Sequence, residues 1–265
     1  MTNPGKKNLA ASVHQRLLNK AKTDNRLFSE LLQYFAIERF LYRLAQSAYQ
    51  DRFVLKGALI FTAWGAPLQR PTRDMDLLAY TSNAVEDVVA IVKSICAVAI
   101  EPDGLTFDPD SVAGERISEQ ADYEGVRVRF KGSLGNARIN LQIDMGFADV
   151  VTPKPEIVEY PSLLDMPQPR LRGYPRETVV AEKLQALVVL GEANSRMKDF
   201  YDLWLLSQTF EFDDALLAEA IAKTFAHRKT DIPTQLPAGL TDEFARSKQS
   251  QWQAFLRTGK IGDVP

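Results

Sequence analysis

Two carboxylates, Asp74 and Asp76, lie one residue apart in an apolar run, residues 74–79, that is typical of a β-strand. Because alternate side chains of a strand share a face, both carboxylates point the same way. Two adjacent like charges raise at least one pKa, which is unfavourable unless a cation lies between them. The pair therefore predicts a site for Mg²⁺ or Mn²⁺, with a solvated strand edge as the alternative.

The elements around this pair indicate a site for phosphate. A short strand at residues 53–56 precedes Gly57 and Ala58, and a helical run follows to Trp64. Gly57 permits close backbone approach of a phosphate, whereas Ala58 offers no hydroxyl to it. Arg70 and Arg73 stand just before the carboxylates, where they can pair with them or contact phosphate oxygens.

A third carboxylate, Asp144, ends an alternating run at residues 139–144 that predicts a half-buried strand. It is either a third metal ligand or general base, or a turn residue at the end of its strand. On another predicted strand Arg127, Arg129 and Lys131 alternate and share one face. These cations are either solvated surface or a contact for a polyanion such as tRNA.

A second group of charged residues lies between Arg176 and Leu206, where the spacing predicts two helices. In the first, Lys183 stands beside an apolar stripe formed by Val180, Leu184, Leu187 and Val188. In the second, Asp199 and Asp202 share a face, and Lys198 can pair with Asp202. Lys183 either contacts a ligand or extends to water, and the carboxylates either face a site or form a solvated ion-pair ladder.

The order and spacing of these blocks resemble the AbiEii/AbiGii family of nucleotidyltransferase toxins, which includes the MenT toxins of bacterial type IV toxin–antitoxin systems. The resemblance rests on YFAIERFLYRLAQSAY, on FVLKGALIF followed by RPTRDMDLL, and on ETVVAEKLQAL followed by RMKDFYDLWLL. A strand, a small-residue turn, a helix and two alternating carboxylates are also similar to the arrangement in polymerase β-type nucleotidyltransferases. Ala58 departs from this pattern, since many relatives have Gly or Ser there.

The resemblance implies a role for each matching residue. Metal would be bound by Asp74 and Asp76, with Asp144 as the third carboxylate. The catalytic residues would be Asp74, Asp76, Lys183 and Asp202, and the nucleotide contacts Gly57, Ala58, Arg73, Lys183 and Asp199. The enzyme would transfer nucleotides from a nucleoside triphosphate to RNA, with the tRNA 3′ acceptor end as the expected target, and so block translation. A separately encoded antitoxin is the implied protein partner.

A hydrolase that uses the same metals stays open from the sequence, although no Ser-His or Cys-His arrangement is visible. Two further functions also stay open. One is a phosphotransferase of the same fold that acts on a serine of a protein such as the antitoxin. The other is a non-catalytic, nucleotide-binding interaction protein, against which the intact pair of Asp74 and Asp76 argues.

We predict an α/β (α+β) fold, with a polymerase β-type nucleotidyltransferase lobe built on a mixed sheet and a helical C-terminal lobe. The expected parts are a helical segment at 1–50, the sheet domain at 51–152, a proline-rich connector at 153–175 and a helical domain at 176–265. Six prolines between residues 153 and 175 argue against a helix or a central strand there. A loop rich in Gly, Asp and Pro is expected at 101–114, and the active site is expected in the cleft between the lobes.

Composition is that of a folded, charged protein. The chain has 265 residues, 45% hydrophobic and 25% charged, and a net charge of −2, which argues against a general nucleic-acid coat. One cysteine, Cys96, cannot form an intramolecular disulfide. No apolar run reaches membrane-spanning length and no signal-peptide pattern is present, so we expect a cytoplasmic protein that binds no membrane.

Overall fold

The computed structural model describes residues 4–66, 72–118, 124–259, 261, 262 and 264. These residues form two compact units. Unit 1 contains the described residues up to Gly65 together with Thr72–Ala148 and Ile157–Gly173. Unit 2 contains Ala66, Asp149–Glu156 and the described residues from Tyr174 onward.

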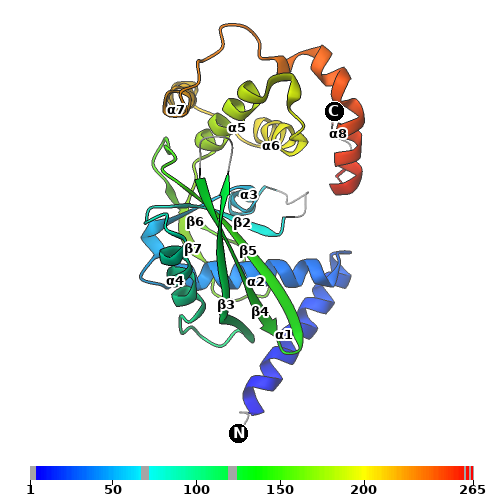
Figure 1. Cartoon of the computed structure of the whole chain (residues 1–265). Helices are drawn as coiled ribbons and strands as arrows, with labels where there is room; N and C mark the ends of the chain where they lie inside the picture. Colours follow the sequence, from blue (N-terminus) through cyan, green and yellow to red (C-terminus); the bar gives the residue numbers. More distant parts are fainter. Residues whose placement is uncertain (1–3, 67–71, 119–123, 260, 263, 265) are drawn as a thin grey trace. The chain divides into compact units, whose positions relative to one another are not determined.

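Unit 1 is built on a mixed sheet of seven strands in the order β3-β4-β5-β2-β1-β7-β6 (Figure 1). The strands are β1 (Phe53–Lys56), β2 (Asp74–Ala79), β3 (Leu105–Ser118), β4 (Glu124–Leu134), β5 (Ala137–Phe147), β6 (Glu156–Glu159) and β7 (Arg170–Gly173). Two of the pairings, β2 with β5 and β1 with β7, are parallel. The pairings of β1 with β2, β3 with β4 and β4 with β5 are antiparallel. The mixed α/β fold that the sequence predicted is confirmed.

The two faces of this sheet differ because its strands alternate. On β4, Val126, Val128 and Phe130 are buried, whereas Arg129 is exposed and Arg127 half-buried. The apolar side packs against helices α2 (Phe28–Ala45) and α4 (Val85–Cys96), and α1 (Pro4–Thr23) packs on α2 (Figure 1). The short helix α3 (Ala58–Ala63) lies between β1 and β2 in the chain. The opposite face of β4, β5 and β2 is left to polar side chains.

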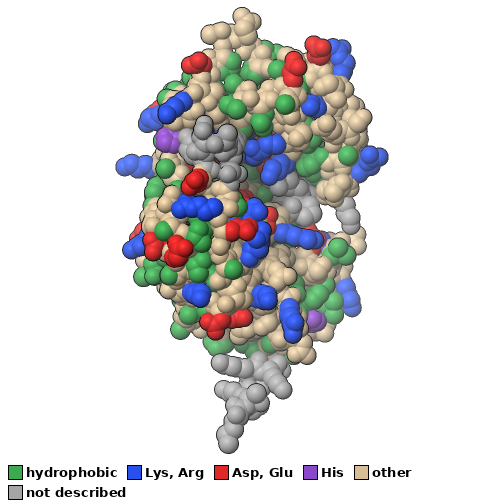
Figure 2. Space-filling view, in the orientation of Figure 1, with side chains coloured by type: hydrophobic (Ala, Val, Ile, Leu, Met, Phe, Trp, Pro, Cys, Tyr) green, Lys and Arg blue, Asp and Glu red, His purple; other side chains and the backbone are tan. Residues whose placement is uncertain are grey.

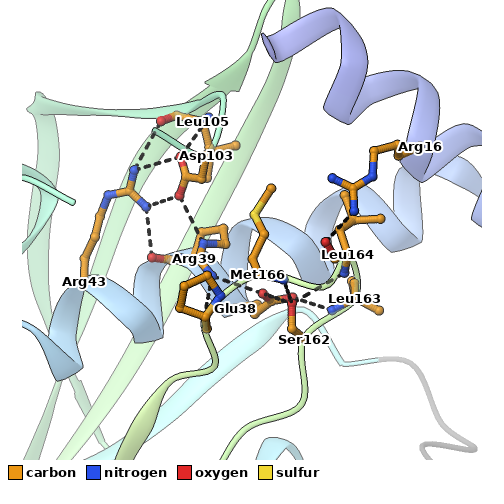
Figure 3. Close-up of polar contacts among 11 residues, drawn as sticks. Arg16, Glu38, Arg39, Arg43, Asp103, Leu105, Ser162, Leu163, Leu164 and Met166 are labelled. Atoms are coloured by element: carbon orange, nitrogen blue, oxygen red, sulfur yellow. Dashed lines mark hydrogen bonds and ion pairs between the residues drawn. The ribbon is translucent and has the colours of Figure 1, made fainter. Parts of the chain in front are cut away.

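A buried ion network holds α2 to two loops of unit 1 (Figure 3). Asp103 accepts hydrogen bonds from Arg39 Nε at 3.1 Å and from Arg43 Nη1 at 2.8 Å. Glu38 accepts bonds from the Ser162 hydroxyl and the Leu163 N–H, both at 2.9 Å. Burial raises the pKa of Glu38, and the hydrogen bonds it accepts oppose that rise. The network fixes the helix whose apolar residues cover the sheet.

Unit 2 is helical in its larger part. It contains α5 (Arg176–Leu190), α6 (Met197–Thr209), α7 (Asp214–His227) and α8 (Asp242–Gly259). Helix α5 packs on α6 and α7, and α6 packs on α8. Aromatic rings fill the contact between α6 and α8, where the centroids of Phe200 and Phe244 are 5.3 Å apart.

Three local predictions were wrong. Residues 101–114 do not form a loop throughout, because β3 begins at Leu105 and accommodates Pro109 at a register shift between Asp108 and Ala113. The proline-rich segment contains two short strands, and β7 lies inside the sheet between β1 and β6. On α5 the fully buried residues are Thr178, Val179, Ala181, Gln185, Ala186 and Leu187, so only Leu187 of the expected stripe belongs to that face.

The surface carries charges of both signs. Figure 2 shows acidic and basic side chains interspersed on the face drawn, in keeping with the net charge of −2. Among the helices that the structure describes, none combines the length and apolarity needed to cross a bilayer.

Candidate active site

The register of the sheet brings three predicted carboxylates together in unit 1. Strand β2 runs parallel to β5, and the Cα atoms of Asp76 and Asp144 are partners in this register, as are those of Asp74 and Gln142. Side chains at partnered positions lie on the same face, about 5 Å apart across neighbouring strands. Asp74 is exposed, Asp76 is half-buried and Asp144 is 9% exposed. The polar face of the sheet therefore carries an acidic centre.

Gly57 lies against one of these carboxylates. It has φ +68°, and a Cβ placed on it would fall 1.9 Å from Asp76 Oδ2. Only glycine both adopts this backbone conformation readily and leaves room for the carboxylate. Ala58 follows as the first residue of α3 and is buried. The small-residue turn predicted to approach a phosphate thus also sets the position of Asp76.

Two cations flank the carboxylates along one row of the sheet. Lys56, at the end of β1, is the Cα partner of Asp76 and is 9% exposed. On the other side Arg127 of β4 is the Cα partner of Asp144. The row across four strands is therefore Lys56, Asp76, Asp144 and Arg127, with Asp74 one position along β2. Two positive charges partly offset the repulsion among three negative ones.

Arg127 binds Asp144 with two parallel hydrogen bonds. Its Nε lies 2.8 Å from Oδ1 and its Nη2 lies 2.6 Å from Oδ2. Hydrogen bonding to Asp144 raises the pKa of Arg127 above its ordinary value, and the charges of Asp144, Asp74 and Glu115 add to this rise. Both oxygens of the third carboxylate are thus engaged by a fully charged guanidinium.

These carboxylates fit a divalent cation whose coordination is completed by oxygens of the substrate. Among the residues that the structure describes, no three His, Cys, Asp or Glu side chains are arranged to enclose a metal ion. Mg²⁺ at nucleotide sites is usually held by one or two carboxylates together with substrate phosphates. Asp74 and Asp76, separated by one residue on β2 and so on the same strand face, supply such a pair.

The remaining predicted residues form a buried ion cluster in unit 2. Lys183 Nζ on α5 lies 2.7 Å from Asp199 Oδ1 and 2.8 Å from Asp202 Oδ2 on α6. Arg196 Nε, at the start of α6, lies 2.7 Å from Asp199 Oδ2. The carboxylates are 5% and 3% exposed, so they do not form a solvated ion-pair ladder. Lys198, the partner that the spacing offered for Asp202, is exposed.

The electrostatics of this cluster keep Lys183 charged. Burial by itself lowers the pKa of Lys183, but Asp202 and Asp199 outweigh that effect and the pKa is raised above its ordinary 10.5. An ammonium group has three donors, and two of them are directed at these carboxylates. As far as the described residues go, one donor therefore remains for another acceptor.

The structure thus gathers the predicted residues in two groups, one in each unit. Gly57, Asp74, Asp76 and Asp144 are together, and Lys183, Asp199 and Asp202 are together. Arg73 is exposed beside Asp74, and its carbonyl oxygen accepts a hydrogen bond from Gln33. Arg70 lies outside the described residues. The sequence analysis did not assign Lys56 or Arg127 to the site. Lys56 could have been found from the sequence, because it is a charged residue at the end of the apolar run FVLK.

Comparison with protein families assigns most of the chain to one family. The family model described as the nucleotidyl transferase AbiEii toxin of type IV toxin–antitoxin systems matches residues 39–265. The chain belongs to the AbiEii family. The match includes both groups of charged residues, and the resemblance predicted from the sequence is confirmed. None of the curated proteins compared with this AbiEii chain matches it.

Solved structures that are similar to this AbiEii protein include two of low sequence identity. JHP933 from Helicobacter pylori is 17% identical with a TM-score of 0.43, and the alignment covers 84% of this chain and 90% of that one. An antigenic nucleotidyltransferase-like protein from Paracoccidioides brasiliensis is 12% identical with a TM-score of 0.42, covering 82% and 91%.

Proposed function

We propose that this AbiEii protein transfers a nucleotidyl group from a nucleoside triphosphate to RNA, with the tRNA 3′ acceptor end as its target. The observation that carries the proposal is the carboxylate pair of β2, held beside Gly57 on the polar face of the sheet. Family membership supports the reaction class, because the matched family is one of nucleotidyl transferase toxins.

In the proposed reaction a terminal RNA hydroxyl oxygen attacks the α-phosphorus of the triphosphate. A new phosphorus–oxygen bond forms, the bond to the β-phosphate oxygen breaks, and pyrophosphate leaves. The hydroxyl proton passes to a carboxylate or to water. A divalent cation, when bound, neutralises charge on the triphosphate and acidifies the attacking hydroxyl.

Each residue has a proposed task in that reaction. Asp74 and Asp76 bind Mg²⁺ or Mn²⁺, and Gly57 and Ala58 leave room for the phosphates. Arg73 contacts phosphate oxygens from its exposed position beside Asp74. Lys183 contacts phosphate with its third donor, while Asp199 and Asp202 fix its ammonium group. Asp144 is the third carboxylate of the group, and its metal-binding role stays a prediction.

Toxicity follows from such a reaction. A tRNA with an extended 3′ end cannot be aminoacylated, so translation and growth stop. We expect a separately encoded antitoxin to oppose this effect, as the type IV toxin–antitoxin assignment of the family indicates.

The test is transfer to total tRNA with each nucleoside triphosphate labelled in turn at the α-phosphate, followed by sequencing of the labelled 3′ ends. Label should enter tRNA with the wild-type chain and not with Asp76→Asn, which removes charge at constant side-chain volume. A parallel reaction with γ-labelled triphosphate separates the alternatives. Label that enters a protein from the γ-phosphate, with none entering RNA from the α-phosphate, would replace the proposal with phosphotransfer.

A further inference from the structure

Arg127 lies on the same face and in the same row as the proposed metal-binding pair. Its Cα partner is Asp144, whose own partner on the next strand is Asp76. Neighbouring strands are about 4.8 Å apart, so the backbone of Arg127 is about 10 Å from that of Asp76. A side chain as long as arginine can reach a ligand bound at the carboxylates from there.

One edge of the Arg127 guanidinium is bound, and the other has no hydrogen-bond partner among the described residues. The Nε and Nη2 edge donates to both oxygens of Asp144. Within the described part of the chain, no acceptor lies within hydrogen-bonding distance of Nη1, and the side chain is 29% exposed. The bidentate pair therefore holds the planar group in one orientation with donors to spare.

Arg129 provides an internal comparison two residues along the same strand face. Its Nε donates to Gln142 at 3.0 Å and its Nη1 donates to Glu115 at 2.7 Å. The side chain is 53% exposed. Both edges of Arg129 are thus engaged by groups of the protein, and its partners are not the carboxylates of the site.

Asp144 differs from the other two carboxylates in its surroundings. Both of its oxygens accept charge-assisted hydrogen bonds, and its side chain is only 13% exposed, whereas Asp74 is exposed and Asp76 half-buried. A metal ion at Asp144 would have to share oxygens with a guanidinium that carries a like charge. The contacts of Asp144 instead indicate that it orients the Arg127 guanidinium.

We propose that Arg127 binds the phosphate tail of the nucleoside triphosphate through its Nη1 edge and that Asp144 is the positioning residue that holds it there. This inference rests on the proposed function, because it assumes a triphosphate at the carboxylate pair. A guanidinium fork suits phosphate oxygens, and a fixed fork loses less side-chain entropy on binding than a mobile one.

The binding test uses inorganic tripolyphosphate with Mg²⁺, so the identity of the base does not matter. Calorimetry with full-length Arg127→Met should show affinity reduced about tenfold to a hundredfold, the range for a charge-assisted hydrogen bond. The affinity of Arg127→Met for orthophosphate with Mg²⁺ should fall less than its affinity for tripolyphosphate. The ratio of the two affinities, which measures the preference for the longer phosphate chain, should therefore decrease. Arg129→Met is the matched control and should bind tripolyphosphate as the wild type does.

Asp144→Asn separates a positioning role from metal binding. We expect it to weaken tripolyphosphate binding about as much as Arg127→Met, and the double variant to show no further loss, because both changes remove the same contact. Binding of Mn²⁺ alone, followed by electron paramagnetic resonance of the free ion, should be unchanged in Asp144→Asn and lost in Asp76→Asn. Equal loss of Mn²⁺ binding in both variants would make Asp144 a metal ligand and overturn the inference.

Folding and the proposed function have their own controls. Arg127→Lys retains a charge beside Asp144, and we expect only partial recovery of tripolyphosphate affinity from it because lysine lacks the fork. If Arg127→Met and Arg127→Lys both melt as the wild type does and bind tripolyphosphate fully, the inference fails. The proposed function would survive that failure if Mn²⁺ binding still depends on Asp76. A wild-type chain that binds neither Mn²⁺ nor tripolyphosphate overturns both.

Discussion

Gly57 and Asp76 are in such close contact that a Cβ on the glycine would fall 1.9 Å from the carboxylate oxygen Oδ2. The contact arises because β1 ends at Lys56, the cross-strand partner of Asp76, and the chain then turns with φ +68° at Gly57. The same glycine thus ends a strand, begins a helix and limits where the carboxylate can lie. Backbone geometry and proposed chemistry are coupled at this position.

Gly57→Ala should therefore remove activity by displacing Asp76. We expect nucleotidyl transfer and Mn²⁺ binding to be lost. The free energy of unfolding should fall by about 1–3 kcal/mol, because alanine is strained at a positive φ. Gly65→Ala is the matched control, since Gly65 has φ +75° and, apart from its chain neighbours, no atom of the described residues lies within 4 Å of the added Cβ. It carries backbone strain without a clash. Equal activity losses in the two variants would show that strain alone, and not Asp76, accounts for the effect.

Cys96 should be unreactive in the folded chain. It ends α4, is 7% exposed, and burial raises the pKa of its thiol to about 12. With an ordinary pKa near 8.5, the unfolded thiol has about a thousandfold larger thiolate fraction at pH 8. Reaction with a disulfide reagent at pH 8 should be slower by about that factor in the native state than in guanidinium chloride. A native rate within tenfold of the unfolded one would contradict the burial.

Much of the fold was predictable because its signals are local. Alternation along residues 139–144 indicated β5, one face of which is buried, and the apolar run at residues 74–79 indicated β2. Strand β3 was missed because its aspartates, proline and glycine resemble a loop, and a register shift accommodates the proline in the sheet. That shift depends on pairing with β4, which is not encoded near those residues.

The candidate site was predictable in part for the same reason. The spacing of Asp74 and Asp76 places them on one face whatever the tertiary structure. The pairing of Arg127 with Asp144 depends on the register of β4 on β5, and that of Lys183 with Asp199 and Asp202 depends on the packing of α5 on α6. Sequence alone offered Lys198 as the neighbour of Asp202, because it shows only contacts within a helix.

Asp103→Asn should destabilise unit 1. Asp103 is 3% exposed and accepts bonds from both Arg39 and Arg43, so the substitution removes the anion that these two buried guanidinium groups share, and leaves Arg39 with Glu38, 3.3 Å from its Nη1. Breaking a buried ion pair in this way costs about 3–5 kcal/mol. The control is Glu124→Gln, whose exposed pair with Arg116 is worth about 1 kcal/mol at most. Urea unfolding measures the loss in free energy of unfolding for both variants. Equally small losses would mean that water solvates the two guanidinium groups in Asp103→Asn.

Lys183→Met should destabilise unit 2 as well as affect nucleotide binding. The change removes the ammonium group that the buried carboxylates of Asp199 and Asp202 share, so a loss of about 3–5 kcal/mol is expected. Lys223→Met, which removes an exposed pair with Glu219, is the control and should cost under about 1 kcal/mol. Addition of Asp202→Asn to Lys183→Met should restore part of the stability. No recovery would indicate lost packing and not unpaired charge.

The effect of pH on this cluster follows from the raised pKa of Lys183. A lysine whose folded pKa exceeds its unfolded value contributes stability that is fully present below the unfolded pKa and is lost as pH rises through the folded one. The stability difference between wild type and Lys183→Met should therefore be constant up to the ordinary value of 10.5 and narrow above it. The difference is measured from the urea midpoints of both proteins, taken from neutral pH to the onset of alkaline unfolding. A stability difference that already becomes smaller near neutral pH would contradict the prediction.

Asp199→Asn and Asp202→Asn separate a structural from a functional role for the pair. Because both carboxylates are buried against Lys183, each change should lower the melting temperature. If the cluster fixes the Lys183 ammonium for a phosphate, the single-turnover rate at a temperature where both variants are folded should fall far more than stability does. Rescue of the rate by Asp202→Glu, which restores an acceptor for Lys183, would support this role. Wild-type rates in both Asn variants, alongside lowered melting temperatures, would assign the cluster to stability alone and remove Lys183 from the proposed chemistry.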